Sequence, residues 1–305
     1  MSQADTQADA NGIRSGLLFA LGAYGMWGVL PGYFRLVASV SPEAVVAQRI
    51  LWSALFVGVF LVLMRRSGEI VEIARNPRHV GLLCISATLI AANWLIFVWA
   101  VGQHRVLDVS LGYFINPLVS ILVGMVVLRE KLSRLQGVAV GLAAAGVALQ
   151  AMLAGGLPWI SLVLAFSFAG YGYLRKITPV RATPGLWVET VLLLPIAGGY
   201  LVLQTNAGVD VFHFGDWAIF LPLLGLGVVT ALPLILFSSA ARRLPMVLIG
   251  LMQYIAPSLH FLTAVLVWHE PLVPATLTTF CIIWLALAIF TYDSWTRWRA
   301  NSKEA

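Results

Sequence analysis

The run SLGYFINPLVSILVGMVVLREKL, residues 110–132, decides the fold of this chain. It is apolar and long enough for a membrane helix, and it recurs 140 residues later as GLMQYIAPSLHFLTAVLVWHEPL, residues 250–272. Two positions recur in register, Pro117 as Pro257 and Glu130 as Glu270. Pro and Glu are disfavoured in membrane helices, so their joint recurrence favours an internal repeat over a chance alignment of apolar runs.

The composition predicts an all-α polytopic membrane protein. Of the 305 residues, 60% are hydrophobic and only 10% are charged, whereas soluble domains have about 25% charged residues. A soluble fold of this composition would have too few polar side chains to cover its surface. The net charge of +6 is therefore no sign of a nucleic-acid partner, and its distribution over the loops carries the information.

Ten apolar runs of membrane-spanning length predict ten transmembrane helices in a lipid bilayer. They cover residues 15–36, 44–64, 80–101, 106–128, 135–153, 157–174, 185–205, 217–240, 246–268 and 272–293. The joins between the third and fourth runs and between the fifth and sixth are very short. Each of these joins predicts a pair of antiparallel helices.

The basic residues predict the orientation of these helices. When the loops are numbered alternately from the N-terminus, all but three of the 19 Lys and Arg residues fall on one side. Arg35 and Arg105 fall on the other side, and Arg49 lies inside the second span. The positive-inside rule then places both termini in the cytoplasm.

A repeat of five spans has an odd number of crossings, so its second copy must be inverted in the membrane. We expect residues 14–153 to form one five-helix repeat and residues 154–294 to form the second. Residues 1–13 are expected to be a disordered cytoplasmic tail, and residues 295–305 a second cytoplasmic tail. Inverted repeats of this kind place a solute site near the middle of the membrane, between the two halves.

Two charged residues inside the spans occupy the same position in the two repeats, Arg49 and Glu189. A charge in the hydrocarbon costs about 2.5–3.5 kcal/mol on insertion scales and usually faces a cavity or a partner. One hypothesis is that the two side chains approach each other or the solute across the repeat axis. The alternative is that each extends to the nearby headgroups, at opposite faces of the membrane.

Several aromatic and amide residues lie in mid-span, away from the interfacial belt where such rings usually gather. They predict a cavity for a small amphipathic or aromatic solute, and the alternative is ordinary packing between helices. The candidate lining residues are Tyr24, Trp27, Asn93, Trp94, Tyr113, Asn116, Tyr171, Gln253 and Tyr254.

Asp108 and His260 are candidates for proton coupling, because both can titrate within or beside a span. The ordinary interpretation of Asp108 is an acidic residue at a helix N-terminus, where the helix dipole favours it. The sequence contains no phosphate-binding loop, no metal-ligand spacing and no nucleophile motif. We therefore expect no enzyme activity, no cofactor and no metal site.

The sequence resembles RarD-type permeases of the EamA group in the drug/metabolite transporter superfamily. The resemblance covers most of residues 14–293 and rests on runs such as Ser110–Leu118, Asn93-Trp94 and Gln253–Ile255. It implies ten helices in two inverted repeats, a central cavity lined by helices 1–4 and 6–9, and peripheral helices 5 and 10. It also implies a location in the bacterial inner membrane and membership among permeases, some described as chloramphenicol-sensitivity proteins.

The expected function is a secondary transporter, with export preferred, of a small organic metabolite or drug-like solute by alternating access. An uncoupled facilitator or channel is the first alternative, and a membrane receptor or assembly factor is the second. In the fifth span, Gly137, Gly141 and Ala145 form a small-residue stripe that lets another helix approach closely. This stripe favours packing within the monomer, with a homodimer contact as the alternative.

Overall fold

The computed structural model describes residues 3–103, 105–153, 159–267, 269 and 274–304. Within these residues the secondary structure is helical, with no strand. The helices are α1 (Gln3–Phe34), a 3₁₀ helix η1 (Arg35–Val37), α2 (Pro42–Leu63), α3 (Ser67–Arg75), α4 (Pro77–Gly102), α5 (Val106–Val126), α6 (Arg134–Leu153), α7 (Trp159–Ile177), α8 (Ala182–Asn206), α9 (Trp217–Ala241), α10 (Met246–Met252), α11 (Ile255–Leu266) and α12 (Pro274–Glu304).

The predicted all-α polytopic fold is confirmed. Nine stretches within the described residues are helical, long and apolar enough to cross a membrane. They match every predicted span except the sixth, which corresponds to α7 and ends in Arg175 and Lys176. The short helix α3 was not predicted and lies in the longest polar loop. The arrangement as two inverted five-helix repeats stays a prediction.

The ends of the chain differ from the expected tails. α1 begins at Gln3, so most of the segment 1–13 continues the first helix, and α12 extends to Glu304 through the segment 295–305. Both segments lack Pro, so neither contains a residue that would end a helix. The assignment of these segments as cytoplasmic tails stays a prediction.

The ninth predicted span is broken into α10 and α11 at Gln253 and Tyr254. The cause is Pro257, which has no N–H and whose ring clashes with the carbonyl four residues earlier, that of Gln253. The Gln253 carbonyl instead accepts a hydrogen bond from the Ala256 N–H at 3.3 Å, a tighter turn than an α-helix. Pro117, 140 residues before Pro257, lies inside the continuous helix α5.

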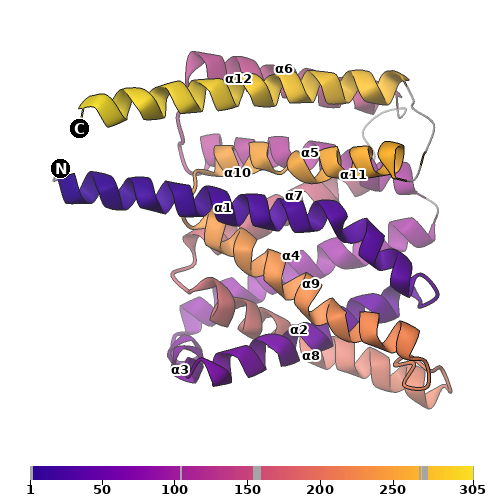
Figure 1. The fold of residues 1–305 in the computed structure, drawn as a ribbon. Coiled ribbons are helices and arrows are strands. Elements are labelled where there is room, and N and C mark those ends of the chain that lie inside the picture. Colours follow the sequence, from indigo (N-terminus) through magenta and orange to yellow (C-terminus); the bar gives the residue numbers. More distant parts are fainter. Residues whose placement is uncertain (1–2, 104, 154–158, 268, 270–273, 305) are drawn as a thin grey trace.

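The helices form a bundle in which distant parts of the chain are neighbours (Figure 1). α5 packs on α7 and α10, α2 packs on α8 and α9, and α1 packs on α9 and α11. α6 and α12 pack on each other at one edge of the bundle (Figure 1). Both chain ends lie at the same end of the bundle as α3, which we call the basic end because Arg66, Arg181 and Arg242 gather there.

At the basic end, a carboxylate fixes the start of α10. Glu130 accepts hydrogen bonds from the backbone N–H groups of Met246 at 2.7 Å and Val247 at 2.9 Å. These are two of the amides that every helix leaves unpaired at its N-terminus. Lys176 donates to the Leu244 carbonyl at 2.6 Å, just before α10. Glu130 is therefore a helix cap for α10, while Glu270 lies outside the described residues.

We expect Glu130→Ala to lower the free energy of unfolding by about 1–2 kcal/mol, because it leaves both α10 amides without their charged acceptor. Glu130→Gln retains one acceptor oxygen and should lose less. Denaturant unfolding of the purified protein in detergent measures both changes. Glu72→Ala, at an exposed position on α3, is the control; equal losses in the control would contradict the capping role.

Candidate functional site

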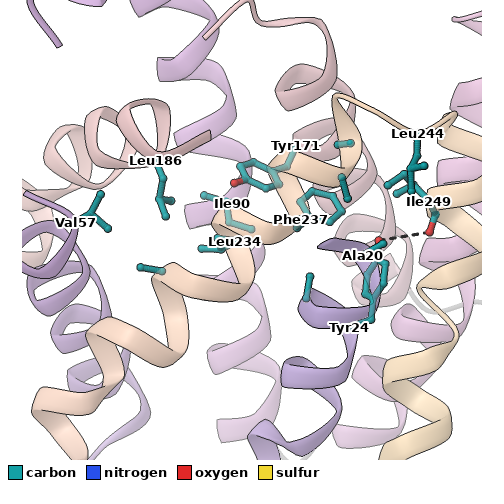
Figure 2. Close-up of a cluster of buried hydrophobic side chains, with 14 of the residues drawn as sticks. Ala20, Tyr24, Val57, Ile90, Tyr171, Leu186, Leu234, Phe237, Leu244 and Ile249 are labelled. Carbon is teal, nitrogen blue, oxygen red and sulfur yellow. Dashed lines mark hydrogen bonds between the residues drawn. The ribbon is translucent and has the colours of Figure 1, made fainter. Parts of the chain in front are cut away.

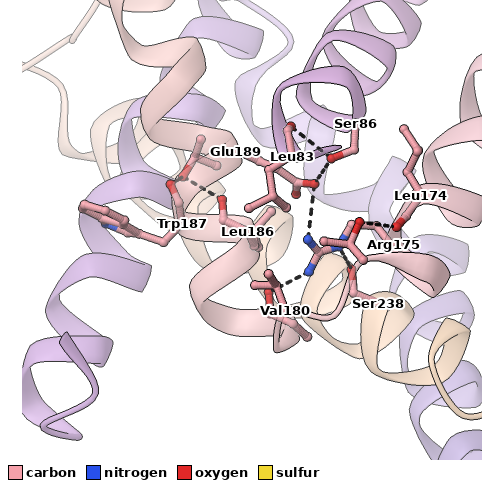
Figure 3. A network of polar contacts seen from close by, with 12 residues as sticks. Leu83, Ser86, Leu174, Arg175, Val180, Leu186, Trp187, Glu189 and Ser238 are labelled. Carbon is pink, nitrogen blue, oxygen red and sulfur yellow. Dashed lines mark hydrogen bonds and ion pairs between the residues drawn. The ribbon is translucent and has the colours of Figure 1, made fainter. Parts of the chain in front are cut away.

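A buried ion pair joins α7 and α8 near the basic end (Figure 3). Arg175 stands in the last turn of α7, and Glu189 stands seven residues after the start of α8. Arg175 Nη1 lies 3.4 Å from Glu189 Oε1, and Arg175 Nε donates to Ser238 Oγ of α9 at 3.1 Å. Ser86 of α4 donates its hydroxyl hydrogen to Glu189 Oε1. We call Arg175, Glu189, Ser86 and Ser238 the Glu189 network.

The Glu189 network is closed to solvent, since Arg175 and Glu189 are each 1% exposed. Gly185 makes room for the guanidinium group, because a Cβ at this position would lie 2.5 Å from Arg175 Nη1. Arg175 was expected in a cytoplasmic loop, and the structure corrects this to the interior. Arg175 lies four residues after Tyr171, a predicted lining residue, so the two side chains lie on the same face of α7. This spacing could have shown from the sequence that Arg175 points into the protein.

Two polar atoms in this region, the Glu189 Oε2 atom and the Tyr171 hydroxyl, are buried and make no well-formed hydrogen bond to a described residue, although the Tyr171 hydroxyl is close enough to interact with Glu189 and Ser238. Tyr171 is 0% exposed, and its hydroxyl lies within electrostatic range of Glu189. Buried polar atoms usually have partners, and an unpaired one costs about 1–3 kcal/mol. Such atoms are therefore open positions for a ligand.

The Tyr171 ring belongs to a buried aromatic cluster in the middle of the bundle (Figure 2). It stacks on Phe237 of α9 at a centroid distance of 5.9 Å and an interplanar angle of 15°. Tyr24 and Trp27 of α1 and Phe168 of α7 complete the aromatic cluster, with Trp27 centred 5.6 Å from both Phe168 and Phe237. The structure thus brings together Tyr24, Trp27 and Tyr171, and adds two Phe rings that were not candidates.

Arg49 has different partners from Glu189 and does not pair with it in this structure. Its Nε donates to Thr230 Oγ1 of α9 at 3.0 Å. Its guanidinium group lies over the Trp94 ring at 4.7 Å and the Phe34 ring at 5.5 Å from the centroids. α2 and α8 begin at opposite ends of the bundle (Figure 1), so Arg49 and Glu189 lie toward opposite ends.

Three of the other candidates make hydrogen bonds that tie helices together. Asn93 donates to the Leu164 carbonyl and to Ser167 Oγ of α7, both at 2.9 Å. Tyr254 donates to the Phe114 carbonyl at 3.2 Å, and Gln253 bonds to Ser120. These contacts agree with the packing alternative for these residues.

Two further candidates of the mid-span set differ from these. Tyr113 is 45% exposed and its ring packs against Phe97. Asn116 is buried, and its Oδ1 atom has no hydrogen-bond partner among the described residues. Neither residue contacts the Glu189 network through a hydrogen bond that the structure records.

The two proton-coupling candidates have partners of their own. Asp108 pairs with Arg105 at 2.6 Å within the first turn of α5, the ordinary arrangement for an acid at a helix N-terminus. His260 Nε2 lies 2.9 Å from the Trp27 carbonyl, so α11 and α1 are joined there. No group of three or more His, Cys, Asp or Glu residues within the described part of the chain could hold a metal ion.

Comparison with known proteins agrees with this architecture. Residues 14–152 match the model of the EamA-like transporter family. An uncharacterized transporter of Pseudomonas aeruginosa is 44% identical over 94% of this chain and 96% of its own length. Protein RarD of Escherichia coli is 42% identical over 97% of this chain and 100% of its own.

A more distant relative in Pseudomonas aeruginosa, named chloramphenicol-sensitive protein RarD, is 34% identical over 92% of this chain and 94% of its own length. A protein of known crystal structure shares the fold, with a TM-score of 0.68 over 90% of this chain and 96% of that one, at 19% identity. Full-length similarity at these identities, together with the helical membrane fold, shows that the chain belongs to the EamA-like transporter family, alongside the proteins named RarD.

Proposed function

We propose that this membrane transporter is a secondary transporter that exports a small organic metabolite or drug-like solute by alternating access. It would act in the bacterial inner membrane, with both termini in the cytoplasm. The observation that carries the proposal is a pair of buried atoms, Glu189 Oε2 and the Tyr171 hydroxyl, which make no well-formed hydrogen bond to the described residues. They form an unsatisfied polar position beside a buried aromatic cluster, where a solute with a hydrogen-bond donor and an apolar ring would fit.

The hydrogen-bonding groups of Glu189 and Tyr171 determine which kind of solute would bind there. An ionised Glu189 Oε2 accepts hydrogen bonds only, so the solute would offer an amine, amide or hydroxyl hydrogen. The Tyr171 hydroxyl both donates and accepts. Trp27 and Phe168, the partly exposed members of the aromatic cluster, would pack against the apolar part of the solute. The remaining candidates, Arg49, Trp94, Tyr113 and Asn116, would line the path on the opposite side.

Burial supports alternating access over an open channel. Arg175, Glu189 and Tyr171 are almost fully buried, so a solute reaches them only when helices separate. The Glu189 network joins α7, α8 and α9 of the second half to α4 of the first. Separation at this end would break these contacts, and a solute that replaces Arg175 at Glu189 would compensate for the loss.

A second set of contacts closes the other end of the bundle. Arg49 joins α2 to α9 through Thr230 and to α4 through Trp94. Arg49 and Glu189 each stand seven residues into their helices, about 10 Å from opposite ends at 1.5 Å per residue. The two sets of contacts would open alternately, one at each face of the membrane.

The helix packing supports the proposed inverted repeat. In the proposed repeat, each helix of the first half has an equivalent helix in the second half. The equivalent helices are α1 and α7, α2 and α8, α4 and α9, α5 and the pair α10 and α11, and α6 and α12. The contact of α1 with α9 then corresponds to that of α7 with α4, and the contact of α5 with α7 corresponds to that of α11 with α1. Each of these helix pairs is in contact.

We expect Tyr171→Phe to abolish solute binding without destabilising the protein. The hydroxyl it removes makes no well-formed hydrogen bond and interacts only weakly with Glu189 and Ser238, so the free energy of unfolding should change by less than about 1 kcal/mol. Thermal shifts of the purified protein against amino acids, aromatic metabolites and amphenicols measure binding. A ligand at a hundredfold excess over its Kd stabilises the native state by about 2.7 kcal/mol.

A ligand that stabilises Tyr171→Phe as much as the unmodified protein would contradict this site. Tyr292→Phe, at an exposed position on α12, is the matched control. Reconstituted vesicles separate the transporter from a facilitator, because only the former accumulates the solute against its gradient.

We expect Arg175→Met to lower the free energy of unfolding by about 3–5 kcal/mol, because it leaves the Glu189 carboxylate buried without its cation. Adding Glu189→Gln should recover part of this loss, so that the double variant is more stable than the sum of the single changes predicts. Unfolding of the four proteins in the cycle measures the coupling. Strict additivity would show that the two side chains act independently.

We expect Arg49→Lys to cost about 1 kcal/mol, because an ammonium group keeps the charge but loses the flat contact with Trp94. Unfolding in detergent measures this cost, and vesicle transport should slow in the same variant. Arg14→Lys, at an exposed position near the start of the first span, is the control. A stability equal to that of the control would remove Arg49 from the closure of this end.

A further inference from the structure

A pocket of about 500 Å³ opens at the basic end, just outside the Glu189 network. It lies where α3 begins, α8 begins and α9 ends. Four arginines and two hydroxyl residues are among its lining: Arg66, Arg181, Arg242, Arg243, Thr183 and Ser239. Neither the family membership nor the proposed transport function assigns a ligand to this pocket.

The positive charge of the pocket is largely uncompensated. Glu69 is the acid next to it, pairing with Arg66 at 2.7 Å and more distantly with Arg181 at 3.4 Å. The hydrogen bonds from Arg66 lower the pKa of the Glu69 carboxyl, so Glu69 supplies one negative charge at neutral pH. Arg242 and Arg243 form no ion pair with an acid in the described part of the chain.

The backbone holds these two arginines in place. Arg242 Nη1 donates to the Val180 carbonyl at 2.6 Å, and Arg243 Nη1 donates to the Ser239 carbonyl at 2.8 Å. Burial, together with the neighbouring guanidinium groups of Arg175, Arg243 and Arg181, lowers the pKa of Arg242. Like charges are thus fixed close together, and their repulsion is relieved when an anion binds between them.

Uncharged donors in the same pocket also lack partners. Thr183 is 9% exposed, and its hydroxyl makes no hydrogen bond that the structure records within the described residues. Thr183 stands in the first turn of α8, a helix of 25 residues whose N-cap Arg181 provides no side-chain cap. The free amides and the dipole of a helix N-terminus favour a bound anion.

We propose that this pocket binds a phosphate group, either the headgroup of an anionic phospholipid or a soluble phosphate ester. Guanidinium groups match phosphate oxygens in a bidentate geometry, and Thr183 adds a neutral donor to the same position. The volume suits a headgroup or a small ester, since ligand pockets measure about 300–1,000 Å³. The exposed Val62, Leu63 and Met64 at the end of α2 precede Arg66 and give acyl chains an apolar surface next to the pocket.

Two measurements on the full-length protein in neutral detergent test the proposal. Native mass spectrometry compares retention of phosphatidylglycerol with that of phosphatidylcholine, and calorimetry titrates glycerol 3-phosphate. The test variant combines Arg181→Gln with Arg243→Gln, both in the pocket. The charge-matched control combines Arg75→Gln with Arg78→Gln, which are exposed at the same end but do not line the pocket.

We expect the test variant to bind at least tenfold more weakly than the control. Selective retention of phosphatidylglycerol alone identifies a lipid site, and saturable binding of glycerol 3-phosphate identifies a site open to soluble esters. Equal affinity of the test variant and the control overturns the proposal, as does the absence of selective binding in both measurements. If the double variant fails to fold, Thr183→Val decides, with an expected affinity loss of at least threefold without any change of charge.

Discussion

The buried side chain of Glu189 imposes the constraint on which this end of the bundle depends. A carboxylate that is 1% exposed needs a cation and hydrogen-bond donors within the protein. Arg175 and Ser86 supply them from α7 and α4. Gly185 leaves room for Arg175 between α7 and α8, where a Cβ would displace the guanidinium group from its present position. This one network thus joins four helices.

The same network bears on the opening step of the transport cycle that we propose. Replacing a buried ion pair by apolar residues often leaves stability equal or higher, so the pair is poor evidence of a stabilising role. What it provides is a contact that is strong while complete and easily exchanged for another polar partner. Glu189 Oε2 and the Tyr171 hydroxyl already lack a well-formed hydrogen bond to a described residue. In the transport cycle that we propose, exchange of this contact joins closure of the basic end to the presence of a polar ligand.

The sequence predicted the fold class because membrane helices have a signal that depends only on length and hydropathy. It also identified Glu189 as a charged residue inside a span that needs a partner. It identified Tyr171, Tyr24 and Trp27 as candidate lining residues. It missed Arg175, because a basic residue at the end of an apolar run is assigned to a loop unless its helical face is considered. It also missed the capping role of Glu130, since that depends on a contact with Met246, more than a hundred residues away.

The break between α10 and α11 has a mechanical consequence. Resistance to bending in a helix comes from its repeated backbone hydrogen bonds, and Pro257 has already removed the bond that would cross Gln253. α10 is held by Glu130 at its first turn, whereas α11 is connected to it only by a tight turn. Bending stiffness is therefore lowest at one point along this span. A force on α11 would therefore bend the span at Gln253 and leave α10 in place.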